Sequence, residues 1–69
     1  MIDLKEKELR FFTVNRDNFH VGFIDKPSKT WRVYFTWEQK KYHRSSFESI
    51  VELIEERFED KVNVKYLGE

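Results

Sequence analysis

Residues 30–37, TWRVYFTW, alternate between two kinds of side chain along the whole segment. Every second residue is large and apolar: Trp31, Val33, Phe35 and Trp37. The residues between them are polar or amphipathic: Arg32, Tyr34 and Thr36. Because successive side chains of a β-strand point to opposite faces of its sheet, this segment predicts a strand with one face on a core. Its second face is therefore the first candidate for contact with a partner.

The length of the chain limits the architecture around this strand. With 69 residues, the sequence predicts one small domain covering residues 1–69. A chain this short buries only roughly 60% of its unfolded surface, so the seven Phe, three Tyr and two Trp have to supply much of the core. Cysteine is absent, which excludes disulfides and thiolate sites and suits a reducing, cytoplasmic environment. No apolar stretch approaches the ~20 residues that a membrane helix needs, so no membrane partner is expected.

Two further strands are expected before the TWRVYFTW segment. Residues 9–14 alternate weakly, and residues 19–24 alternate with Phe19, Val21 and Phe23 on one face. The cluster at residues 15–18, NRDN, predicts a turn between them, and Pro27 predicts a loop over residues 25–29. Residues 1–8 are highly charged, so we expect them to be frayed or to form a single helical turn.

A fourth strand is expected over residues 40–45, after a turn at Glu38-Gln39. A loop of two or four residues would place Lys41 and His43 on the face of Arg32, and Tyr42 and Arg44 on the opposite face. A loop of three residues would reverse this arrangement, because a shift by one residue moves every side chain to the other face. The sequence leaves both registers open.

The segment after the fourth strand has the pattern of an amphipathic helix. Ser45 and Glu48 have the spacing of a capping box. The apolar stripe recurs every three or four residues at Phe47, Ile50, Val51, Ile54 and Phe58. Residues 62–67 alternate again and suggest a short final strand. The predicted fold is therefore α+β: an antiparallel sheet of three to four strands, with one C-terminal helix packed on one face.

The residues that catalysis or metal binding would require are scarce. The chain has two His, two Gly and no Cys, so it has no Gly-rich phosphate loop and no patterned nucleophile, base or ligand set. We therefore expect no enzymatic activity, no catalytic residue, no cofactor and no metal site.

The distribution of charge favours binding instead. Formal net charge is zero, yet residues 26–44 carry six basic groups and one acidic group, while residues 45–61 carry six acidic and two basic groups. Basic groups beside an aromatic and a hydroxyl suit contact with phosphates and base edges of DNA or RNA. The residues expected to contact nucleic acid are Arg32, Tyr34, Thr36, Lys40, Lys41, His43 and Arg44.

The order of features over residues 20–58 resembles the arm-type, Apetala-like DNA-binding domain of tyrosine integrases. The features that carry the resemblance are Trp31, the Glu38-Gln39 turn, the basic segment KKYHR at residues 40–44, the junction Ser45-Ser46-Phe47 and the helix from Glu48. The resemblance implies three antiparallel strands with one helix behind them, and an exposed sheet face that reads DNA. It implies that the readers are Arg32, Tyr34, Lys41 and His43. A short, charged, aromatic-rich chain of this kind also resembles accessory proteins of phages and mobile elements.

Other interpretations of the same surfaces stay open. The sheet face is also typical of an ordinary solvated strand pair. The acidic helix face, or an uncovered sheet edge, would suit a protein-binding accessory factor or inhibitor, acting as a monomer or homodimer. The residues of that alternative site are Glu48, Glu52, Glu55, Glu56 and Glu59.

Overall fold

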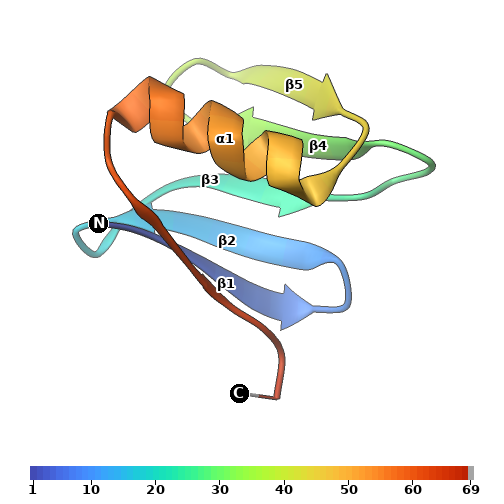
Figure 1. Cartoon of the computed structure of the whole chain (residues 1–69), viewed down its shortest axis with the longest axis horizontal. Helices are drawn as coiled ribbons and strands as arrows, with labels where there is room; N and C mark the ends of the chain where they lie inside the picture. Colours follow the sequence, from blue (N-terminus) through green and yellow to red (C-terminus); the bar gives the residue numbers. More distant parts are fainter. Residues whose placement is uncertain (69) are drawn as a thin grey trace.

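The computed structural model describes residues 1–68 and contains one mixed sheet and one helix (Figure 1). The elements are β1 (Ile2–Glu8), β2 (Phe11–Arg16), β3 (Phe19–Asp25), β4 (Trp31–Phe35), β5 (Lys40–Arg44), α1 (Phe47–Phe58) and β6 (Val62–Lys65). The six strands lie in the order β5-β4-β3-β2-β1-β6. The α+β class and the single helix are confirmed, but the sheet has more strands than the three to four predicted.

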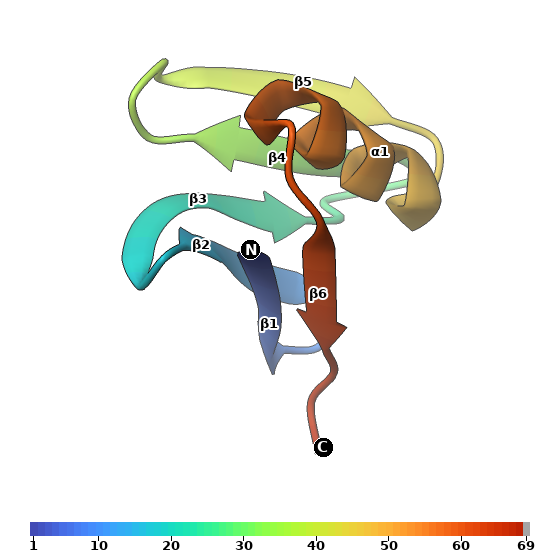
Figure 2. The same ribbon diagram turned by 60° about the vertical axis from the view of Figure 1, so that its left-hand side comes forward.

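The topology is an antiparallel meander followed by a crossover connection to the far edge of the sheet. Strands β1 to β5 pair antiparallel with their neighbours in sequence order. The chain then passes through α1 and returns to the far side of β1, where β6 pairs with it in parallel. The final strand is thus confirmed, and it makes the sheet mixed rather than purely antiparallel. The strong twist of the sheet turns β1 and β6 away from the direction of β4 and β5 (Figure 2).

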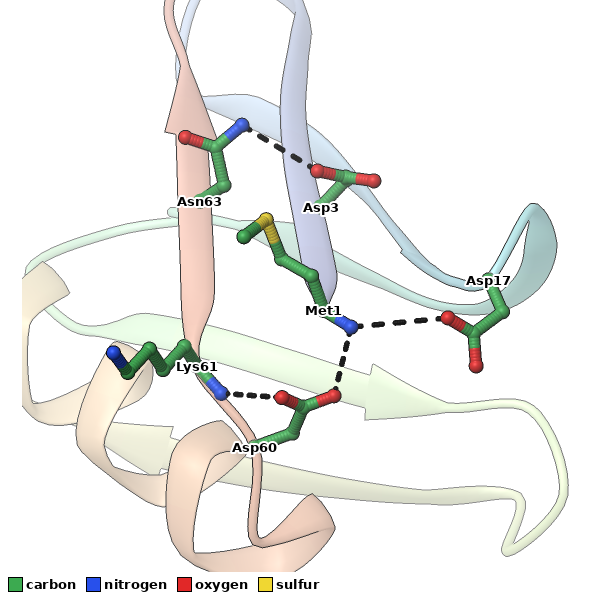
Figure 3. Close-up of polar contacts among 6 residues, drawn as sticks. All are labelled: Met1, Asp3, Asp17, Asp60, Lys61 and Asn63. Atoms are coloured by element: carbon green, nitrogen blue, oxygen red, sulfur yellow. Dashed lines mark hydrogen bonds and ion pairs between the residues drawn. The ribbon is translucent and has the colours of Figure 1, made fainter.

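The prediction for residues 1–8 was wrong, because they form a fully paired strand. Strand β1 lies between β2 and β6, and the side chains of Ile2 and Leu4 are completely buried. The chain start is also held by charge (Figure 3). The Met1 amine lies 2.8 Å from an Asp60 carboxylate oxygen and 3.7 Å from one of Asp17. These contacts raise the pKa of the amine and lower the pKa of Asp60, in each case chiefly through their mutual hydrogen bond.

Tight turns set the register of the first three strands. Residues Asp17 and Asn18 have φ of 50° and 71°, and they close the β2–β3 hairpin as a two-residue turn of the I′ type. The turn expected at residues 15–18 is therefore confirmed for its last two residues, whereas Asn15 and Arg16 still belong to β2. The strand predicted from residue 9 begins two residues later, because Arg10 adopts φ 61° in the β1–β2 turn.

A bulge in β3 overturns the predicted facing of that strand. Val14 pairs with Gly22 and the next residue, Asn15, pairs with His20, so Val21 is an extra residue in β3. Val21 consequently packs toward the core, while Phe23 points to the opposite face. The sequence placed Val21 and Phe23 on one face, because strict alternation cannot anticipate a bulge.

The core lies between the sheet and α1. Its fully buried side chains come from every strand of the sheet except β5 and β6, and from the helix: Ile2, Leu4, Phe12, Val14, Ile24, Val33, Phe35, Ile50 and Ile54. The predicted helix stripe is confirmed, with Phe47, Val51 and Phe58 half-buried beside Ile50 and Ile54. Trp31 packs on the rings of Phe12 and Phe47, as its place on the core face predicts. Trp37 is 53% exposed because it lies in the turn beyond β4.

The helix begins one residue later than the capping box predicted. Ser46 is the N-cap, and its side chain accepts a hydrogen bond from the backbone N–H of Ser49 at 3.2 Å. At its other end, Arg57 forms an ion pair with Glu38, which also accepts a hydrogen bond from the Tyr42 hydroxyl. This network fastens the β4–β5 turn to α1. Within residues 1–68, no helix has the length and apolarity needed to cross a bilayer.

Candidate nucleic-acid interface

The register of the β4–β5 hairpin decides which side chains share a face. Phe35 pairs with Lys40, so residues 36–39 form a four-residue loop in which Gln39 adopts φ 55°. The predicted facing for a loop of two or four residues is therefore confirmed. Arg32 lies opposite His43, and Tyr34 lies opposite Lys41. All four point away from the helix, since their strand neighbours Val33 and Phe35 are buried beneath α1.

The surface opposite α1 is the open face of the sheet. One register row crosses all six strands on this face, from β6 to β5: Lys65, Lys5, Thr13, Phe23, Tyr34 and Lys41. Adjacent strands lie roughly 4.8 Å apart, so the row extends about 24 Å along the curved sheet. It has lysines at both ends and aromatic rings at its centre. We call these six residues the open-face row.

A shallow hollow of about 280 Å³ lies over the central strands of the open face. Its lining is Phe11, Phe23, Asp25, Arg32, Tyr34 and Lys41. The rings of Phe11 and Phe23 are stacked, with centroids 5.6 Å apart and planes inclined by 28°. The His20 ring meets Phe23 edge-on at 4.6 Å. Phe23 is held on two sides and is still 37% exposed, so its ring is a fixed aromatic surface on the open face.

Arg32 is already paired within the hollow. Its Nε donates to Asp25 Oδ1 at 2.8 Å, and its Nη2 donates to the other carboxylate oxygen. These hydrogen bonds raise the pKa of Arg32 and keep its charge permanent. The pair fixes the guanidinium but neutralises it, so Lys41 carries the unbalanced positive charge of the hollow. Among the interactions of residues 1–68, the Lys41 ammonium takes part in no ion pair.

The seven residues predicted to contact nucleic acid do not all meet. Arg32, Tyr34, Lys41 and His43 share the open face. Thr36 lies beyond β4, where its hydroxyl donates to the Val21 carbonyl oxygen at 3.3 Å. Lys40 and Arg44 lie on the opposite side of β5, with the Lys40 ammonium 5.2 Å from the centre of the Tyr42 ring. These three residues are therefore not part of the hollow. Lys40 and Arg44 alternate with Lys41 and His43 along β5, and Thr36 follows the end of β4.

Sequence reasoning missed the residues that the first three strands contribute to this face. Lys5 was missed because β1 was not recognised, and Thr13 because the weak alternation of residues 9–14 did not show which face it occupies. Phe23 was missed because the bulge in β3 is not visible in the sequence. Asp25, predicted to begin the loop over residues 25–29, is the last residue of β3 and lies opposite Arg32. The sequence does contain one signal for the facing of Phe23. Phe23 lies between Gly22 and the apolar Ile24, so if Ile24 faces the core then Phe23 faces away from it.

The acidic residues of the alternative site lie on the helix, across the sheet from the open face. Glu48, Glu52 and Glu56 are exposed on α1, Glu55 is half-buried, and Glu59 is the C-cap with φ 52°. The acidic half of the charge asymmetry therefore lies on the helix side, whereas the basic residues of the segment 26–44 are divided between the two sides of the sheet. Among residues 1–68, no group of three or more His, Cys, Asp or Glu side chains is arranged to hold a metal ion.

Comparison with known proteins gives no family assignment. No family model matches the chain, and neither a curated protein nor a solved structure is similar to it.

Proposed function

We propose that this protein is a non-enzymatic binding module that contacts nucleic acid through the open face of its sheet. The observation that carries the proposal is the open-face row, in which lysines flank a central pair of aromatic residues. Lysines attract phosphates, and aromatic rings offer contact to bases whatever their sequence. His43 and Arg32 lie in the neighbouring register row and extend the same surface.

Electrostatics also favours this face over the other. The exposed carboxylates of α1 repel a polyanion, whereas Lys5, Lys41 and Lys65 attract it. A nucleic acid that approaches the molecule is therefore steered toward the sheet. This steering operates through exposed charges, so the association should weaken as salt is added.

The family resemblance supports the same function. It covers residues 20–58, which contain β3, β4, β5 and α1 in the order that the arm-type domain implies. The role proposed for such a module is that of an accessory protein of a phage, a mobile element or a bacterial cell, acting in the cytoplasm. DNA and RNA both satisfy the chemistry of the open face.

A second candidate function is binding of a protein partner at the C-terminal end of α1. Trp37 is 53% exposed there, and its ring lies 5.4 Å from that of Phe58. The Arg16 guanidinium lies 5.3 Å from the centre of the same Phe58 ring. An exposed Trp beside an Arg has the composition of a protein-binding hot spot.

The two functions are separated by mapping where nucleic acid binds. Isotope-labelled protein is titrated with mixed-sequence single-stranded and duplex DNA at low and physiological salt, while the backbone amide resonances are followed. We expect shifts in β3, β4 and β5, with an affinity that falls as salt rises. Shifts confined to α1 and Trp37, or no shifts at low salt, would contradict nucleic-acid binding at the sheet.

A further inference from the structure

The open face has an aromatic centre rather than a uniformly polar one, and this restricts the form of nucleic acid that it suits. Phe23 is exposed between two charged flanks, and its ring is fixed by the stacked Phe11 ring and the edge-on His20 ring. A ring that is already immobilised loses little conformational freedom when a planar group stacks on it. The hollow beside the ring, about 280 Å³ in volume, has room for one planar ring system.

A duplex cannot use such a surface well. Its bases are stacked on one another, so it presents base edges in its grooves and not base faces. A duplex is also stiff, with a persistence length of about 50 nm, whereas the open-face row follows a strongly twisted sheet (Figure 2). An unpaired strand exposes its base faces and bends freely. The aromatic centre and the curvature of the row therefore point to the same ligand.

We infer that the open face binds unpaired nucleic-acid strands, with one base stacked on Phe23 in the hollow and the flanking phosphates near Lys41 and Lys5. This inference rests on the proposed function and narrows its ligand to single-stranded DNA or RNA. The Asp25–Arg32 pair lines the hollow and supplies hydrogen-bonding groups for a base edge. Lysines at both ends of the row disfavour a second copy of this chain as the occupant, because two such faces would repel each other.

The test compares matched single-stranded and duplex probes. Fluorescence anisotropy is measured with labelled oligothymidylate and with a mixed-sequence duplex of equal length at low salt. We expect tighter binding of the single strand. Phe23→Leu keeps an apolar side chain but removes the flat ring, so it should weaken single-strand binding roughly 5- to 100-fold. Duplex binding should change little.

The matched control is Phe19→Leu, which makes the same substitution on the same strand. Phe19 is 75% exposed and does not line the hollow, so its replacement should leave both affinities unchanged. Amide spectra of both variants establish that the fold is retained. A nuclear Overhauser contact between thymine protons and the Phe23 ring is the direct signature expected for the wild-type complex.

The failures of the two proposals are distinguishable. If Lys41→Ala weakens binding and Phe23→Leu does not, base stacking is wrong while nucleic-acid binding at the sheet stands. Tighter binding of the duplex would have the same meaning. If neither probe binds at low salt, or if the protein is a dimer in which the Phe23 ring is covered by the second copy, both proposals are overturned.

Discussion

Gly22 in β3 lies so close to Tyr34 in β4 that a Cβ at position 22 would overlap the Tyr34 carbonyl oxygen. The obstacle is backbone, which cannot move aside without shifting β4. This close approach follows the Val21 bulge and helps to set Tyr34 beside Phe23 on the open face. Glycine is required at position 22 because of this contact and not because of an unusual φ.

Gly22→Ala should accordingly lower the free energy of unfolding by about 1–3 kcal/mol, through overpacking of a rigid site. Thr30→Ala, at an exposed position just before β4, is the control and should change it by less than about 0.5 kcal/mol. Denaturant unfolding followed by circular dichroism measures both. Equal stability of the two variants would mean that β3 and β4 are not packed as closely as described.

The buried side chains of β1 make a prediction about the start of the chain. Leu4→Ala should cost about 2–5 kcal/mol, because it removes a fully buried side chain of the core. A chain of this size has a total stability of only a few kcal/mol to about 10 kcal/mol, so the variant should be largely unfolded or close to it. Lys7→Ala, at an exposed position of the same strand, should be nearly neutral. A small effect of Leu4→Ala would restore the view that residues 1–8 are frayed.

The two adjacent serines before α1 give a sharp test of the helix start. Ser46→Ala removes the hydrogen bond to the Ser49 N–H and should cost about 1 kcal/mol. Ser45→Ala should have little effect, because Ser45 is exposed and outside the cap. Thermal and denaturant unfolding of the two variants measures which serine caps the helix. The opposite ranking would show that the helix begins at the earlier serine.

The ion pair between the Met1 amine and Asp60 makes stability depend on pH at both ends of the range. The folded-state pKa of Asp60 is lowered, so its contribution is present above 3.8 and is lost as pH falls through the folded value. The folded-state pKa of the amine is raised, so its contribution is present below 8.0 and is lost as pH rises through the folded value. The amine is exposed and Asp60 is half-buried, so added salt should weaken the effect.

Asp60→Asn isolates this contribution from those of other carboxylates. The difference in unfolding free energy between wild type and variant should be largest between roughly pH 4 and pH 8 and shrink on either side. Asp17→Asn is the control, because Asp17 lies farther from the amine, at 3.7 Å. A difference that does not vary with pH would contradict the ion pair.

Asp25 should lower the affinity of the open face for nucleic acid, because it neutralises Arg32. Asp25→Asn leaves the Arg32 charge unbalanced within the hollow, so binding of single-stranded DNA at low salt should become several-fold tighter. Asp17→Asn, in the β2–β3 turn, makes the same change of charge away from the hollow and should have a smaller effect. Anisotropy titrations measure both, and weaker binding of Asp25→Asn would indicate that the fixed geometry of Arg32 matters more than its free charge.

The sequence was informative where a pattern is local. The alternation around Trp31 and the stripe from Phe47 to Phe58 identified β4, α1 and the side of β4 that meets the helix. The same alternation, with a β4–β5 loop of two or four residues, predicted that four residues of the candidate site share one face: Arg32, Tyr34, Lys41 and His43. The near-equivalent neighbours Ser45 and Ser46 explain why the helix start was displaced by one residue.

The remaining features depend on contacts between distant segments. Ile2 and Leu4 are surrounded by charged residues, so β1 is recognisable only once β2 and β6 are placed beside it. The bulge at Val21 depends on the pairing of β3 with β2. The Asp25–Arg32 pair and the stacking of Phe11 on Phe23 depend on the same pairings, so the aromatic centre of the open face could not be read from local periodicity.

Lys41 and Lys40 offer the most direct test of the central claim, because they are neighbours on β5 with opposite facing. The measurement is the slope of log K against log salt concentration for a single-stranded probe, with wild type, Lys41→Ala and Lys40→Ala. We expect Lys41→Ala to reduce the magnitude of the slope by about 0.7, the change for one lost phosphate contact, and Lys40→Ala to leave it unchanged. A larger effect of Lys40→Ala, or binding that does not depend on salt, would contradict nucleic-acid binding at the open face.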